Sequence, residues 1–216
     1  MKKFLFSIFL AMGTISLFAQ TSTEYDNDMA LMNKYIQEDN MAEAFRLCKK
    51  YADQDNAEAL GMLGIFYEMG WGTAEDKVKA FEAYTKAAEL GSVNAMQRVG
   101  ECYEKGIFIK EDKAKAAKWY MKAANSGDLE AMFRLGKMYL AGQGVEKDST
   151  KGLTYILKAA HQNHSEAQFF LGVQLEKAGK VEEAISWYEK CVANGDGQLP
   201  FVRVAKRSLE ELKNKK

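Results

Sequence analysis

Three residue types recur along this chain at a fixed step of 36 residues. One column holds glycine, a second holds alanine five residues earlier, and a third holds tyrosine three residues later. The positions are Gly64, Gly100, Gly136 and Gly172; Ala59, Ala95, Ala131 and Ala167; and Tyr67, Tyr103 and Tyr139. A period of about 20 to 50 residues is typical of one supersecondary unit that stacks on copies of itself. The step therefore predicts a repeat array, which offers a surface for binding and no indication of a pocket for catalysis.

Composition favours helices in every repeat. The 216 residues contain a single proline and are 47% apolar and 28% charged, which is typical of a folded, all-α chain. We expect four helix-pair repeats, the last with about four residues fewer between its helices than the others. Their expected ranges are 56–91, 92–127, 128–163 and 164–195. A diverged helix pair at 29–55 precedes them, and a capping helix with a basic tail at 196–216 follows, which gives about 11 helices in an α-solenoid.

The N-terminus is typical of an exported protein. Two lysines and an apolar run of about 15 residues lead to Ala19, which is the order of a secretory signal peptide. The run is shorter than the roughly 20 residues of a membrane span, and an uncleaved anchor is the alternative. We expect a leader at 1–19, a flexible segment at 20–28, and a periplasmic or secreted mature chain without integral membrane association.

The charge balance does not favour nucleic acid or an anionic membrane as a partner. The full chain has 30 basic and 30 acidic residues. Removal of Lys2 and Lys3 with the leader leaves 28 basic residues against 30 acidic ones, a net charge of −2. A near-neutral chain of this kind has no strong electrostatic attraction for a polyanion.

The glycine column predicts close packing of neighbouring helices. A glycine inside a helix costs about 1 kcal/mol relative to alanine, so its recurrence indicates that another helix approaches there. An apolar column just before it supplies the packing partner, at Leu63, Val99, Leu135 and Leu171. We expect the glycine, alanine and tyrosine columns to be structural positions. Between the helices, Gly70, Gly106 and Gly142 are expected to end the first helices, and Asp76, Asp112 and Asp148 to cap the second ones.

No metal, cofactor or catalytic site is predicted. Cys48, Cys102 and Cys191 lie in separate predicted helices without a CxxC pair, and we expect them to be buried as small apolar side chains. His161 and His164 have no cysteine nearby that would complete a zinc site. The GxG sequences between the helices lack the preceding strand and full spacing of a nucleotide loop. Neither SxxK nor GxSxG is present to support hydrolysis.

The repeats resemble the Sel-one-like repeat (SLR), a subclass of the tetratricopeptide solenoids. The pattern is A-x-x-x-L-G-x-x-Y-x-x-G-x-G-V-x-x-D-x-x-K-A-x-x-W-Y-x-K-A-A-x-x-G. Its first half is matched by Ala131, Leu135, Gly136, Tyr139, Gly142, Gly144, Val145 and Asp148, and its second half by Asp112, Lys115, Ala116, Trp119, Tyr120, Lys122, Ala123, Ala124 and Gly127. The resemblance covers about 56–195, and the fourth repeat, with its short connection, is similar to an ordinary tetratricopeptide repeat.

The resemblance implies a right-handed superhelix of antiparallel helix pairs that serves as an adaptor or scaffold for other proteins. Secreted SLR proteins with paired cysteines in each repeat are associated with penicillin binding or β-lactamase activity, so hydrolysis or binding of β-lactam or cell-wall amides is the alternative function. This chain lacks those paired cysteines. We therefore expect a protein or peptide partner, no cofactor and no enzyme activity.

The first helices of such repeats line a concave side, where a partner would bind. The expected groove residues are Gln97, Glu101, Glu104, Phe133, Lys137, Leu140, Phe169 and Val173. Phe133 and Phe169 leave two interpretations open. Either the tight superhelix partly buries them, or they stand exposed as an apolar anchor for a peptide or helix of the partner.

Overall fold

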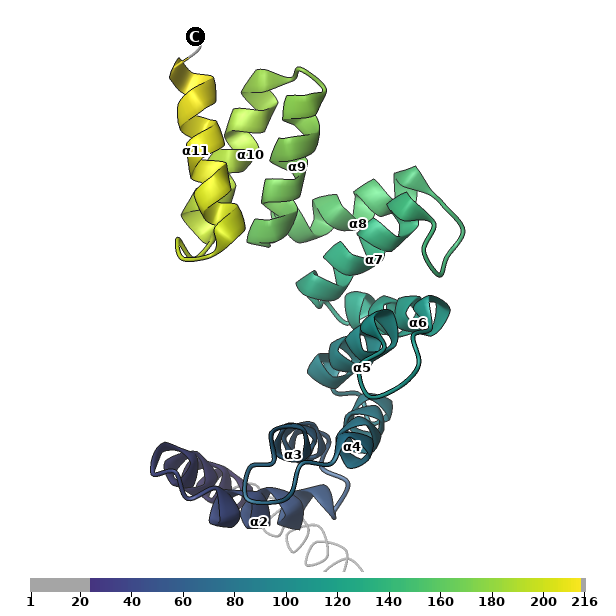
Figure 1. The fold of residues 1–216 in the computed structure, drawn as a ribbon, viewed down its shortest axis with the longest axis vertical. Helices are drawn as coiled ribbons and strands as arrows, with labels where there is room; N and C mark the ends of the chain where they lie inside the picture. The colour runs from purple at the N-terminus through teal and green to yellow at the C-terminus, as the bar shows by residue number, and fades with distance from the viewer. Residues whose placement is uncertain (1–23, 215–216) are drawn as a thin grey trace, which may run out of the picture. The chain divides into compact units, whose positions relative to one another are not determined.

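The computed structural model describes residues 24–214 and divides the chain into two compact units, Met1–Ser92 and Val93–Lys216 (Figure 1). Every regular element in the described range is a helix, which confirms the all-α prediction and its 11 helices. A helical stretch covers 24–37. It is followed by α2 (Met41–Ala52), α3 (Ala57–Met69), α4 (Lys77–Glu89), α5 (Val93–Lys105), α6 (Lys113–Asn125), α7 (Leu129–Ala141), α8 (Ser149–His161), α9 (Ser165–Lys177), α10 (Val181–Asn194) and α11 (Pro200–Asn214). The predicted leader at 1–19 lies outside the described residues.

The first unit consists of two helix pairs, 24–37 with α2 and α3 with α4. The first of these pairs covers 24–52 and overlaps the region where the sequence predicts a diverged pair, 29–55. The prediction of a flexible segment at 20–28 is wrong for residues 24–28, which are helical. Contacts of Tyr25 explain the order, because its ring packs edge-on against Tyr51 at 4.9 Å and its hydroxyl donates to Glu58 at 3.0 Å.

The second unit contains three helix pairs and a closing helix. The pairs are α5 with α6, α7 with α8, and α9 with α10, and α11 packs against α10 and α9 (Figure 1). Seven residues connect the helices of the earlier pairs, as at 142–148, whereas only 178–180 connect α9 to α10, as the sequence predicts. Pro200 begins α11, a position that needs no backbone N–H. The inner face of α11 buries Val202, Ala205 and Leu212, so this helix closes the apolar core.

Each glycine of the 36-residue column lies where the second helix of the same repeat approaches the first. A Cβ at Gly100 would lie 2.8 Å from the ring of Tyr120, and one at Gly172 would lie 2.6 Å from the ring of Tyr188. The alanine column is also buried, with Ala131 and Ala167 at 0% exposure. The glycine and alanine columns therefore lie in the packed interior, whereas the tyrosine column is only half-buried.

The tyrosine that faces the glycine donates its hydroxyl to a glutamate four residues after that glycine. Tyr84 donates to Glu68 and Tyr120 to Glu104, both at 2.7 Å, and Tyr188 donates to Glu176 at 2.6 Å. We name each of these a Tyr–Glu clasp. It ties the two helices of one repeat together, because the hydroxyl of a deeply buried ring finds its acceptor on the other helix.

The third repeat replaces the whole clasp with apolar contacts. Its glycine, Gly136, faces Ile156 in place of tyrosine, and Leu140 stands where the other repeats have glutamate. Gly152 makes room for Leu140, since a Cβ at Gly152 would lie 2.8 Å from the Leu140 Cγ atom. The donor and the acceptor are thus both absent from this repeat, and no buried hydroxyl is left without a partner.

A double-mutant cycle tests the clasp in the fourth repeat. We expect Glu176→Leu to lower the free energy of unfolding by about 1 to 2 kcal/mol, because the Tyr188 hydroxyl then loses its acceptor. In the Tyr188→Phe background the same change is expected to cost less than about 0.5 kcal/mol, since no donor remains unpaired. Urea unfolding followed by circular dichroism measures both steps, and equal costs in the two backgrounds would contradict the clasp.

Side chains and glycines at the helix ends follow the predicted pattern. Asp76, Asp112 and Asp148 each accept a backbone N–H of the helix they precede, at 2.9 Å. Gly142 ends α7 in the left-handed region. Gly144 has a φ of 69° and lies against the start of α6, where an added Cβ would be 2.1 Å from the Lys113 carbonyl oxygen.

The described residues show buried cysteines, but neither a metal-binding cluster nor a helix suited to spanning a membrane. Cys48, Cys102 and Cys191 are buried and form no disulfide, and burial raises the pKa of Cys48 to about 12 and that of Cys191 to about 11. Within 24–214 no cluster of three or more His, Cys, Asp or Glu side chains is arranged to hold a metal ion. Over the same described range, no helix has the length and apolarity needed to cross a bilayer.

Candidate functional site

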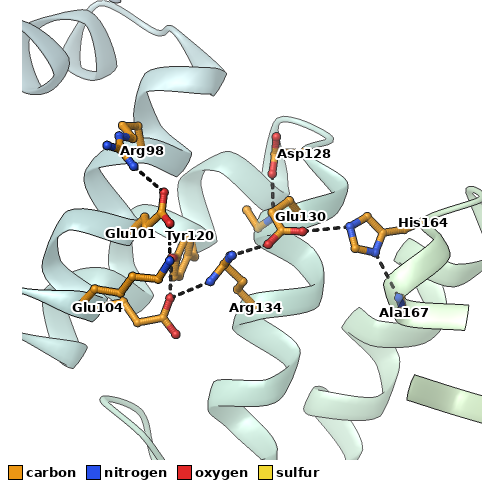
Figure 2. A network of polar contacts seen from close by, with 11 residues as sticks. Arg98, Glu101, Glu104, Tyr120, Asp128, Glu130, Arg134, His164 and Ala167 are labelled. Carbon is orange, nitrogen blue, oxygen red and sulfur yellow. Dashed lines mark hydrogen bonds and ion pairs between the residues drawn. The ribbon is translucent and has the colours of Figure 1, made fainter. Parts of the chain in front are cut away.

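A chain of polar contacts runs across the first helices of three successive repeats in the second unit, α5, α7 and α9 (Figure 2). Arg134 of α7 is at its centre: its Nη1 atom contacts Glu104 Oε2 of α5 at 3.2 Å, and its Nε atom contacts Glu130 Oε1 at 2.5 Å. The other oxygen of Glu130 contacts His164 Nε2, before α9, at 3.0 Å. We name Glu104, Glu130, Arg134 and His164 the polar chain.

His164 occupies the cap position that precedes α9. The equivalent positions are Asn56 before α3 and Asp128 before α7, whose side-chain oxygens accept the N–H three residues later. His164 does the same with a nitrogen, because its Nδ1 atom accepts from Ala167 N–H at 3.2 Å. The proton of the neutral ring therefore lies on Nε2, where it donates to Glu130. One imidazole thus caps its own helix and holds the neighbouring repeat.

The polar chain is partly shielded from solvent, which strengthens the attraction between its opposite charges. The side chains of Glu104 and Arg134 are each 26% exposed. The hydrogen bond from His164, with the Arg134 charge acting against burial, holds the pKa of Glu130 below its ordinary value. Burial and the hydrogen bond to Glu104 raise the pKa of Tyr120. Tyr120 therefore stays protonated and acts as a hydrogen-bond donor.

A second ion-paired group extends the same surface on α5. Glu101 contacts Arg98 at 2.8 Å and Lys105 at 2.5 Å (Figure 2 shows the first). Burial raises the pKa of Glu101, but the two cations outweigh it and the net shift is downward. Glu101 was expected to line the groove and lies on α5, one of the first helices. Its carboxylate is already paired with Arg98 and Lys105 of the same helix.

A small open pocket lies along the polar chain. Its volume is about 50 Å³, and it is lined by Glu104, Glu130, Phe133, Arg134, Lys137 and Glu166. Three of these residues, Glu104, Phe133 and Lys137, belong to the groove expected from sequence. The space admits a few water molecules or the end of one side chain, so the surface suits contact with a protein better than enclosure of a small molecule.

The structure decides between the two interpretations of Phe133. The side chain is only 2% exposed, so an exposed apolar anchor at this position is excluded. Its ring packs on the rings of His164, at 5.4 Å, and Phe170, at 5.9 Å. The Lys137 ammonium lies 5.1 Å from the Phe133 ring centroid on the exposed side. At this point of the predicted groove, Lys137 is therefore the exposed residue and Phe133 lies beneath it.

The predicted groove is not continuous from α7 to α9. Phe169 and Val173 pack into the C-terminal core with α10 and α11, where Phe169 lies 5.9 Å from Phe201 and 6.1 Å from Tyr188. Phe169 is half-buried there, which is the other interpretation that the sequence left open. The closing helix covers this part of α9.

Two of the expected groove residues, Leu140 and Glu104, face the second helices. Leu140 packs against Gly152, and Glu104 accepts a hydrogen bond from the Tyr120 hydroxyl. Both residues therefore contribute to the pairing of the two helices of a repeat. The assignment of Leu140 to the groove is therefore wrong. Glu104 serves both surfaces, because the same carboxylate oxygen also contacts Arg134. Gln97 is half-buried on α5.

Four residues of this surface are absent from the sequence-based set: Glu130, Arg134, His164 and Glu166. One signal was available, because Glu130 and Arg134 are spaced i,i+4 as in a helical ion pair. The contacts from Arg134 to Glu104 and from His164 to Glu130 join residues 30 and 34 positions apart. Those contacts depend on how successive first helices are aligned, which local spacing does not specify.

The surface presents charged and hydrogen-bonding groups, most of which are already engaged with one another. Both His164 nitrogens are engaged, and Tyr120 donates to a carboxylate, so neither group is placed to transfer a proton to a ligand. Exposed charge remains at Lys137, and the Glu166 carboxylate faces the same pocket. These groups suit contacts with polar side chains of another protein.

Comparison with known proteins identifies the repeats. The family model described as the Sel1 repeat matches residues 57–92, 93–128, 129–164 and 165–196, which together cover well over half of the chain. The chain belongs to the Sel1-repeat family. The matched ranges differ by one residue from the repeat boundaries expected from the 36-residue step. Sel1-repeat proteins generally act as scaffolds for protein–protein interaction, without catalysis of their own. No protein of curated function matches the chain in sequence.

Solved structures share this fold. A protective antigen of uropathogenic Escherichia coli with an SLR fold is 32% identical over 81% of this chain, with a TM-score of 0.69. This chain spans 37% of that antigen. A Sel1 repeat protein from Oxalobacter formigenes is 28% identical over 81% of this chain and 78% of its own length, with a TM-score of 0.67. An immunity protein from Pseudomonas aeruginosa is 20% identical over 85% of this chain and 80% of its own, with a TM-score of 0.52, and supports the fold alone.

Proposed function

We propose that this Sel1-repeat protein is an exported scaffold that binds a protein partner through the first helices α5, α7 and α9 of its second unit. The observation that carries the proposal is the pocket lined by residues of all three helices. It joins three repeats on one surface, which is how repeat proteins build extended binding sites. Export is supported by the charged and apolar start of the sequence.

Preorganisation supports binding at this surface. Arg134 and Glu130 are held by neighbours on both sides, so a partner meets charged groups whose positions are already fixed. Lys137 and Glu166 are the adaptable members, because the structure gives neither of them an ion-pair partner within residues 24–214. We assign these two residues to first contact with the partner, and the polar chain to holding the surface in shape.

Site-specific photo-crosslinking in the native host tests the proposal. A benzophenone amino acid at position 137 is expected to form a cross-linked adduct with one dominant protein, identified by mass spectrometry. The matched control places the same amino acid at position 206, because Lys206 is exposed on α11, away from the pocket. Adduct formation is expected to fall at least about fivefold when Glu166→Lys is added.

Two results would contradict the scaffold function. One is the same set of adducts from positions 137 and 206, which would show that the first-helix face has no specific partner. The other is turnover or acylation of a chromogenic β-lactam by the purified chain, which would favour hydrolysis. Fractionation of the same cells, with detection of the mature chain in the periplasm or medium, tests export separately.

A further inference from the structure

One face of α6, directed away from the core, carries only hydrogen-bond donors. Lys115, Lys118, Trp119 and Lys122 are spaced i, i+3, i+4 and i+7, so they form one stripe along the helix. The buried residues of α6 lie on the other side, at Ala116, Ala117, Tyr120, Ala123 and Ala124. We name the first set the lysine stripe. No Asp or Glu occurs within the bounds of α6.

The equivalent stripe in every other repeat has an acidic or neutral residue where α6 has Lys118. In α4 it reads Lys79, Glu82, Ala83 and Lys86; in α8, Lys151, Thr154, Tyr155 and Lys158; and in α10, Glu183, Ser186, Trp187 and Lys190. The two lysines of the α4 stripe are also neutralised by carboxylates outside that helix, because Lys79 pairs with Asp76 and Lys86 with Asp55. Lys115, Trp119 and Lys122 match the repeat pattern, so Lys118 is the residue that makes the stripe uninterrupted in the second repeat. The fold does not require a cation at this position, because the other repeats have Glu82, Thr154 and Ser186 there.

The charges of the lysine stripe are largely unpaired. Lys115 has one distant carboxylate, Asp112, at 3.7 Å. Lys118 and Lys122 are exposed and have no carboxylate within 4 Å among the residues that the structure describes. The Lys122 ammonium instead lies 3.9 Å from the centroid of the Trp119 ring. The half-buried Trp119 ring thus joins the cations into one surface, and tryptophan is enriched where proteins bind each other.

We propose that the lysine stripe binds an acidic segment of a partner protein. Ammonium groups and the indole N–H are donors only, and ionised Asp and Glu side chains are acceptors only, so the two are complementary. The stripe covers seven residues, about 10 Å along the helix axis, which matches a short peptide segment. An apolar residue of that segment packs on Trp119 while its carboxylates contact Lys118 and Lys122.

Extended polyanions fit the stripe less well. Stable non-specific binding to duplex DNA involves about 6 to 10 phosphate contacts, more than one helical stripe supplies. The chain as a whole also has a formal net charge of 0, which gives no long-range attraction to a polyanion or an anionic bilayer. This surface is on a second helix and is separate from the pocket on the first helices, so the inference does not depend on the proposed function above.

Fluorescence anisotropy with a labelled peptide of repeated Glu-Glu-Phe units tests the assignment. Lys118→Glu/Lys122→Glu is expected to raise the dissociation constant at least about tenfold. The control, Lys147→Glu/Lys177→Glu, changes the net charge equally at exposed positions outside the stripe and is expected to alter binding by less than about twofold. Peptide binding is also expected to change tryptophan emission, and Trp119→Phe to remove that change.

Three kinds of result would overturn the assignment of the lysine stripe to an acidic segment. Equal weakening in both charge variants would show a general effect of net charge, and failure of the unchanged chain to bind the peptide would exclude the acidic segment. Tighter binding of single-stranded oligothymidine or of phosphatidylserine vesicles, with the same dependence on Lys118 and Lys122, would reassign the stripe to nucleic acid or lipid. Circular dichroism is expected to show equal melting temperatures for the unchanged chain and both charge variants, because the substituted lysines are exposed.

Discussion

Gly144→Ala is expected to lower the free energy of unfolding of the second unit by about 3 kcal/mol or more. Two physical effects add at this position. The backbone has a φ of 69°, a region that costs an L-residue about 1 kcal/mol or more. The added Cβ would also lie 2.1 Å from the carbonyl oxygen and 2.2 Å from the carbonyl carbon of Lys113, so the loop has to move off the start of α6.

Urea unfolding monitored by circular dichroism measures the loss, and Gly127→Ala separates its two causes. Gly127 also has a positive φ, 95°, but a Cβ there would meet no atom within 4 Å. Its substitution is expected to cost only the backbone term, about 1 kcal/mol. If both variants lose the same stability, the contact with Lys113 contributes nothing and the loop is held by its backbone conformation alone.

Arg134→Met is expected to lower the free energy of unfolding of the second unit by about 2 kcal/mol. The substitution leaves the carboxylates of Glu104 and Glu130 without their shared cation. Loss of one partner from a fully buried pair costs about 3 to 5 kcal/mol, but these three side chains are 26–29% exposed and water reduces the effect. The aliphatic part of the side chain is preserved in methionine, so lost packing adds little.

The charge dependence of that loss is the critical measurement. In a Glu104→Gln/Glu130→Gln background, Arg134→Met is expected to cost less than about 1 kcal/mol, because no carboxylate is left unpaired. Lys137→Met is the control on the same helix, and we expect a change within about 0.5 kcal/mol since its ammonium is exposed. An equal loss in both backgrounds would mean that Arg134 acts through packing.

The parts of the fold that were predictable are those determined within one repeat. Gly100 and its equivalents recur because a tyrosine ring of the same repeat lies against them, and the periodic column makes this visible in a single sequence. Asp112 caps α6 through a backbone contact three residues away, which is a local rule. The short connection of the fourth repeat follows directly from residue counting.

The candidate site was less predictable because it depends on contacts between repeats. Phe133 fits the spacing of an exposed column, yet the way α9 packs on α7 places the rings of His164 and Phe170 over it. His164 is an unusual cap residue, so its role as a link between repeats has no signature in its own sequence neighbourhood. Phe169 is covered by Phe201 of the closing helix, which lies outside the repeat period.

The Tyr–Glu clasp has a consequence for how such an array grows. Its donor and acceptor lie on different helices of one repeat, and the third repeat lacks both, with Ile156 and Leu140 in their place. A single helix copied or exchanged between repeats two and three would bring a tyrosine against a leucine, or a glutamate against an isoleucine. The smallest unit that can be duplicated or exchanged intact is therefore the complete helix pair. Chimaeras are best joined in the short turns that follow α4, α6 and α8.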